Sequence, residues 1–129
     1  NPITNGHLDI LKRSLKVFDK VYILVAINRD KTYAFSAEER VEMIKDAVKE
    51  FDNVEVASTE GLTVEFAKKH SATHIIRGLR AITDFEYEFQ LASANRFVDS
   101  SIDSVFFMSP DDKTFISSST VIKISTLDL

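Results

Sequence analysis

The stretch VYILVAI at residues 21–27 decides the fold class of this chain. It is a continuous apolar run rich in β-branched residues, which is typical of a strand buried on both faces in a parallel sheet. Before it, residues 5–18 carry apolar side chains at helical spacing. After it, Ser36 and Glu39 have the spacing of a capping box, which predicts that a second helix begins there. The run therefore lies between two helices.

The alternation of apolar strands and helical patterns continues along the chain. Strands are expected at residues 21–27, 54–57, 74–76 and 104–108, and helices at residues 5–18, from 36, at 62–70, at 84–97 and from 117–119. This order predicts an α/β fold, a Rossmann-like doubly wound parallel sheet with right-handed crossovers. We expect one domain over residues 1–129, with its ligands bound beyond the carboxyl ends of the strands.

Composition excludes several classes of protein. The chain has 129 residues, of which 44% are hydrophobic and 28% charged, as is ordinary for one globular domain. No apolar run is long enough to cross a membrane and no signal-peptide pattern opens the chain, so a membrane partner is not expected. The net charge of −4 argues against a nucleic-acid partner. The absence of cysteine fits a cytoplasmic location.

The string Thr4-Asn5-Gly6-His7 opens the first expected helix. Gly6 would allow a close approach of the backbone to phosphate, and the helix start supplies free N–H groups. The His7 imidazole could stabilise charge that develops on a phosphate in a transition state. The alternative is a plain N-cap followed by a solvated first-turn histidine.

The string RGLR at residues 77–80 follows the third expected strand. Two arginines three residues apart on a turn at this edge could hold phosphates with paired hydrogen bonds, and Gly78 would permit the tight turn. The alternative is a pair of surface arginines that meet the acidic residues Asp84, Glu86 or Glu88.

Two further features could bind phosphate. The string FISSS at residues 115–119 offers hydroxyls and helix-start N–H groups for the outer phosphates of a nucleotide, or a simple N-cap. Lys31 is a mobile positive charge in the loop after the first strand, or merely a solvated lysine. His70 and His74 have no metal-ligand partners at suitable spacing. We therefore expect no metal site of the protein's own, and Mg²⁺ only together with nucleotide phosphates.

Taken together, the motifs resemble those of the bacterial phosphopantetheine adenylyltransferases, a family of the nucleotidyltransferase superfamily. The matching strings are NPITNGH at 1–7, FSAEER at 35–40, IRGLRA at 76–81, DFEYE at 84–88, NR at 95–96 and FISSS at 115–119. The resemblance implies transfer of an adenylyl group from ATP to 4′-phosphopantetheine, with Mg²⁺, giving dephospho-coenzyme A and pyrophosphate. It also implies a homo-hexamer, with coenzyme A as a candidate inhibitor.

The resemblance further implies roles for individual residues. Catalytic roles fall on His7, Lys31 and Arg80. Binding of 4′-phosphopantetheine falls on Lys31, Leu62, Thr63, Arg77 and Asn95. ATP binding falls on Thr4, Gly6, His7, Gly78, Leu79, Arg80, Glu88, Lys113, Thr114, Phe115, Ile116, Ser117, Ser118 and Ser119.

The chain departs from the family pattern at both ends. The family opens with a central strand and closes with further helices, so we expect a domain that is incomplete at both ends and has two exposed ladder edges. Asn1, Thr32 and Lys113 also stand where the family commonly has Asp, Lys and an aromatic residue. Two alternatives stay open: another adenylyltransferase of the superfamily, such as one for nicotinate mononucleotide, and an inactive, oligomer-forming nucleotide-binding fragment.

Overall fold

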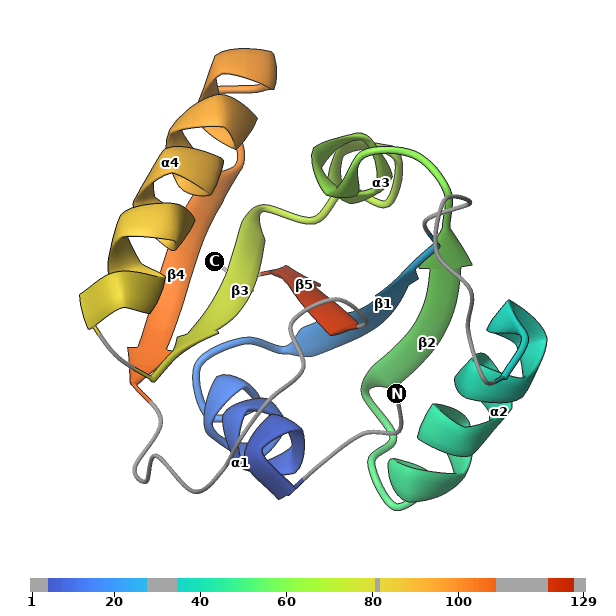
Figure 1. The fold of residues 1–129 in the computed structure, drawn as a ribbon. Helices are drawn as coiled ribbons and strands as arrows, with labels where there is room; N and C mark the ends of the chain where they lie inside the picture. The colour runs from blue at the N-terminus through green and yellow to red at the C-terminus, as the bar shows by residue number, and fades with distance from the viewer. Residues whose placement is uncertain (1–4, 28–34, 81, 109–120, 127–129) are drawn as a thin grey trace.

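The computed structural model describes residues 5–27, 35–80, 82–108 and 121–126 (Figure 1). Its elements in chain order are α1 (Asn5–Ser14), β1 (Lys20–Ala26), α2 (Ala37–Ala47), β2 (Val54–Thr59), α3 (Thr63–Lys69), β3 (His74–Leu79), α4 (Ile82–Val98), β4 (Asp103–Met108) and β5 (Val121–Thr126). None of these helices, within the residues described, has both the length and the apolar character needed to cross a membrane.

The five strands form one sheet in the order β2-β1-β5-β3-β4. β1 is parallel to β2, and β3 is parallel to β4. From β1 the chain moves outward to one edge of the sheet, and from β3 it moves outward to the other. This reversal is the mark of a doubly wound sheet, and it confirms the Rossmann-like α/β fold class.

The last element differs from the expected helix after residues 117–119. Val121–Thr126 is a strand, β5, which lies antiparallel between β1 and β3. The segment VIKIST is rich in β-branched residues, which favour strands. The inner edges of β1 and β3 also offer it unpaired backbone groups, and helical periodicity carries no signal for such long-range pairing. The two exposed ladder edges expected from the family pattern therefore do not occur.

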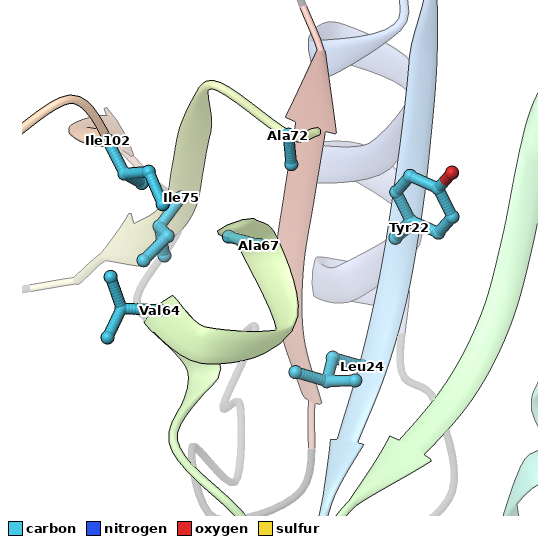
Figure 2. Packing of buried hydrophobic residues seen from close by; sticks show 7 residues of the cluster. All are labelled: Tyr22, Leu24, Val64, Ala67, Ala72, Ile75 and Ile102. Carbon is cyan, nitrogen blue, oxygen red and sulfur yellow. The ribbon is translucent and has the colours of Figure 1, made fainter. Parts of the chain in front are cut away.

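Helices cover both faces of the sheet. Figure 1 shows α1 and α2 on one side and α3 and α4 on the other. Side chains of β1 alternate between the two cores, as the pleat of a strand requires. Val21, Ile23 and Val25 pack in the cluster that contains residues of α1 and α2, whereas Tyr22 and Leu24 pack in the cluster that contains residues of α3. Figure 2 shows the second cluster gathered around α3.

The ends of α2 and α3 are fixed by local hydrogen bonds. The predicted capping box is confirmed, because Ser36 Oγ accepts the Glu39 N–H at 3.1 Å and Glu39 Oε1 accepts the Ser36 N–H at 3.0 Å. At the end of α3, Ser71 has a φ of 58°. The Ala72 N–H then reaches the carbonyl oxygen of Ala67 at 2.8 Å, which closes the helix as a Schellman motif.

Candidate functional site

The RGLR string lies at the end of β3, and its first three residues belong to the strand. Arg77, Gly78 and Leu79 pair with Phe106, Phe107 and Met108 of β4. The expected turn at Gly78 is therefore wrong, and the chain leaves the sheet only after Leu79. Pairing with β4 satisfies the backbone groups of these residues, and the sequence alone does not show how far such pairing extends.

Arg77 forms a buried, two-pronged ion pair with Glu88 of α4. Its Nε donates to Glu88 Oε2 at 2.7 Å, and its Nη2 donates to Glu88 Oε1 at 2.6 Å. Only 10% of the arginine side chain and 7% of the glutamate side chain are exposed. The side-on fork fixes both the place and the plane of the guanidinium group.

Arg80 forms a second pair, with Asp84 in the first turn of α4. The backbone N–H and Nε of Arg80 both donate to Asp84 Oδ2, at 3.2 and 3.1 Å. A carboxylate at this end of a helix also interacts favourably with the helix dipole. Asp84 therefore fixes the backbone of the residue that follows β3 as well as its side chain.

These contacts bear on both readings of the RGLR string. The arginines do meet acidic residues of α4, as the alternative reading expected for Asp84 and Glu88. They are nevertheless not surface pairs, since the side chains are 10% and 7% exposed in the first pair and 23% and 28% exposed in the second. Both pairs lie at the carboxyl end of a parallel strand, where ligands of such sheets bind. The predicted nucleotide contact of Glu88 stays a prediction, while its two carboxylate oxygens bond to Arg77.

Gly6 and His7 lie in the first turn of α1 and are buried. The exposed fraction of His7 is 2%, so the reading as a solvated first-turn residue is wrong. Arg13, in the last turn of α1, donates from Nη1 to the carbonyl oxygen of Met108 at the end of β4, at 2.7 Å. This contact places the last turn of α1 beside the carboxyl end of β4, and the role of His7 in the site stays a prediction.

Three further residues expected to bind 4′-phosphopantetheine lie in two different places in the fold. Leu62 and Thr63 stand at the start of α3, just beyond the carboxyl end of β2. Leu62 is 55% exposed, and its N–H donates to Glu65 Oε1 at 3.2 Å. Asn95 lies seven residues after Glu88 on α4, about 10 Å farther along the helix axis at 1.5 Å per residue. The structure does not bring Asn95 to the edge where the other residues lie.

The remaining predicted site residues lie outside the described residues, so their roles stay predictions. They are Thr4, Lys31, Lys113, Thr114, Phe115, Ile116, Ser117, Ser118 and Ser119. In the part of the chain that the structure describes, no group of three or more His, Cys, Asp or Glu side chains could hold a metal ion.

Comparison with known proteins identifies the family. A family model described as cytidylyltransferase-like matches residues 1–124. Phosphopantetheine adenylyltransferases from two strains of Desulfitobacterium hafniense, DSM 10664 / DCB-2 and Y51, are each 50% identical to this chain over 121 residues. Each match covers 94% of this chain and 74% of the relative. The chain belongs to the phosphopantetheine adenylyltransferase family. The resemblance seen in the sequence motifs, and with it the assignment as a nucleotidyltransferase, is confirmed.

One feature of this family site was missed in the sequence. The sequence left Asp84, Glu86 and Glu88 as alternative partners of the two arginines and assigned none of them to either arginine. Their spacing of four residues, one helical turn, places both acids on one side of α4. Read together with two arginines just before that helix, the spacing could have predicted the two ion pairs.

Proposed function

We propose that this protein is a pantetheine-phosphate adenylyltransferase of coenzyme A biosynthesis. A phosphate oxygen of 4′-phosphopantetheine attacks the α-phosphorus of ATP, the bond from that phosphorus to the bridging oxygen breaks, and pyrophosphate leaves. The product is dephospho-coenzyme A. The observation that carries the proposal is the 50% identity over 94% of the chain to enzymes of this name.

The residues of the site fit a reaction that depends on positioning and electrostatics. Arg77 and Lys31 would hold the attacking phosphate. His7 would stabilise the charge that develops at the α-phosphate, and Arg80 would bind ATP together with the adjoining end of β3. In the described residues, the acids nearest the arginines are engaged in ion pairs. Mg²⁺ bound to the ATP phosphates would neutralise part of their charge.

The decisive experiment is a pyrophosphate-release assay with ATP and Mg²⁺. We expect turnover with 4′-phosphopantetheine and none with nicotinate mononucleotide. Turnover with nicotinate mononucleotide alone would refute the proposed substrate and leave only the superfamily.

A second comparison separates an enzyme from an inactive nucleotide-binding fragment. His7→Ala should lower kcat far more than it lowers ATP affinity, because a group that acts in the transition state contributes little to ground-state binding. Lys49→Ala, on an exposed side chain, is the matched control and should leave both unchanged. Equal losses of kcat and ATP affinity in His7→Ala would contradict the role of His7.

We also propose that the protein self-associates, as a homo-hexamer by resemblance to the family, through the surface of α4. Large hydrophobic side chains are exposed along this helix, including Tyr87 at 63%, Phe89 at 57% and Phe97 at 93%. Exposed clusters of large apolar side chains commonly mark sites of protein–protein contact. Light scattering should give an oligomer for the wild type and a smaller species for Phe97→Glu. A monomeric wild type would refute this proposal.

The location and regulation are proposals of the same kind. A role in coenzyme A synthesis and a chain without cysteine favour the cytoplasm. Coenzyme A contains the phosphopantetheine moiety of the substrate, so we expect it to inhibit by competing with 4′-phosphopantetheine. Inhibition whose strength does not depend on the 4′-phosphopantetheine concentration would refute that mode.

A further inference from the structure

The two ion pairs beside the site form a nested pattern. The arginines lie three residues apart at the end of β3, and the acids lie four residues apart near the start of α4. The inner pair is Arg80 with Asp84 and the outer pair is Arg77 with Glu88, so the chain reverses between them. Each arginine that could bind phosphate is thus held by an acid on the helix that follows it.

The outer pair leaves one edge of the Arg77 guanidinium group available. Of its five N–H donors, the pair with Glu88 uses Nε–H and one hydrogen of Nη2. One hydrogen of Nη1 and the second hydrogen of Nη2 form the neighbouring, end-on edge. Among the described residues, no acceptor bonds to that edge. Two parallel N–H groups on one edge match two oxygens of a phosphate group.

We propose that Glu88 is a positioning residue, which holds Arg77 so that its end-on edge binds the phosphate of 4′-phosphopantetheine. This inference rests on the proposed function, and it gives Glu88 a different task from the nucleotide contact that the resemblance implies. A free arginine side chain can adopt many rotamers, whereas a buried two-pronged pair fixes its plane. The acid acts through the arginine and does not touch the substrate.

A purely structural role would not explain the choice of residues. A buried ion pair loses much of its Coulomb energy to desolvation, and apolar residues of similar size often stabilise a protein at least as well. An apolar pair at positions 77 and 88 would therefore pack α4 on β3 without the two charges. What only the ion pair provides is an oriented cation at the carboxyl end of β3.

The test is Glu88→Asp, which keeps the charge and shortens the side chain by one methylene. Glu86→Asp, an exposed position on the same helix, is the matched control. Misplacement of a binding group by about 1 Å can lower the rate as much as 100-fold. We therefore expect Glu88→Asp to raise the KM for 4′-phosphopantetheine roughly tenfold or more, to change the KM for ATP less than about twofold, and to leave the control unchanged.

A double-mutant cycle shows whether Glu88 acts through Arg77. In an Arg77→Ala background, Glu88→Asp should have little further effect on the KM for 4′-phosphopantetheine. Calorimetric titration with 4′-phosphopantetheine alone, on variants whose thermal unfolding confirms a folded protein, gives the same comparison without turnover.

Three results would overturn the inference. They are a rise in the KM for ATP instead, an unchanged KM and affinity for 4′-phosphopantetheine, and an equal effect of Glu88→Asp with and without Arg77. Failure of the proposed function would give a different result, because the wild type would then transfer the adenylyl group to an acceptor other than 4′-phosphopantetheine. In that case a raised KM for that acceptor in Glu88→Asp would uphold the positioning role, and an unchanged KM would overturn it.

Discussion

Removing the charge of Glu88 should destabilise the protein far more than the same change at the surface. In Glu88→Gln, an amide replaces one of the two carboxylate oxygens that accept from Arg77 at 2.6 and 2.7 Å. The amide can still accept one hydrogen bond, but its NH₂ group would face an arginine donor. The guanidinium charge would then lie in a site where its side chain is only 10% exposed, without an opposite charge. Loss of one partner of such a buried pair costs about 3–5 kcal/mol.

Two comparisons isolate this effect. Asp46→Asn removes the acid of the Lys49–Asp46 pair, whose side chains are 76% and 78% exposed, and should cost less than about 1 kcal/mol. Replacing both members of the buried pair, Arg77→Met with Glu88→Met, removes both charges and fills the space with apolar atoms. This double variant should be more stable than Glu88→Gln alone and come within about 2 kcal/mol of the wild type.

The measurement is the free energy of unfolding in urea at neutral pH, with one slope shared by all variants. The total free energy of unfolding of a small domain is about 5–15 kcal/mol, so a loss of about 3–5 kcal/mol in Glu88→Gln would be readily measured. A cost no larger than that of Asp46→Asn would refute the reasoning, because the ion pair would then behave as a solvated one. A double variant no more stable than Glu88→Gln would also refute it, because the loss would then not come from an unpaired charge.

Three smaller predictions test the scaffold. Ile76→Ala, at a core position that is 1% exposed, should lower the free energy of unfolding by about 2–5 kcal/mol, and a loss under about 1 kcal/mol in urea would contradict its burial. Ser71→Gly should raise the melting temperature, gaining about 1 kcal/mol or less, because glycine adopts the φ of 58° without strain; a lowered melting temperature would contradict this. The backbone N–H of Ser36 lowers the pKa of Glu39 below its ordinary value of 4.5. The capping box should therefore stabilise the protein above that pH and lose this effect as the pH falls through the lowered pKa. Glu39→Gln should remove this acid dependence in pH-resolved melting curves, and an unchanged profile would count against it.

The sequence predicted the parts of the fold that depend on local pattern. The run at residues 21–27 and the capping box of Ser36 and Glu39 gave a strand and a helix start that the structure confirms. Features that depend on pairing between distant segments were missed. Gly78 was expected in a turn but pairs with Phe107, and VIKIST was expected in a helix but pairs with β1 and β3.

The candidate site shows the same division. The arginines were found because their charge and their position after a strand carry a local signal. The partners of these arginines were not assigned, because a choice among Asp84, Glu86 and Glu88 depends on which side of α4 faces β3. Helix periodicity separates Glu86 from the other two acids, but it does not say which side is inward.

The two ion pairs also bear on how an acidic protein could bind two substrates rich in phosphate. The chain carries a net charge of −4, and Asp84 and Glu88 offset the charges of Arg80 and Arg77 at the end of β3. A net positive charge at the end of β3 therefore does not explain how these two arginines would bind phosphate. What remains is a set of N–H donors held in fixed directions, which need little reorganisation when a phosphate arrives. On this argument, neutralising Glu88 would increase the net positive charge of the site and still weaken the binding of 4′-phosphopantetheine, because direction would be lost while charge was gained.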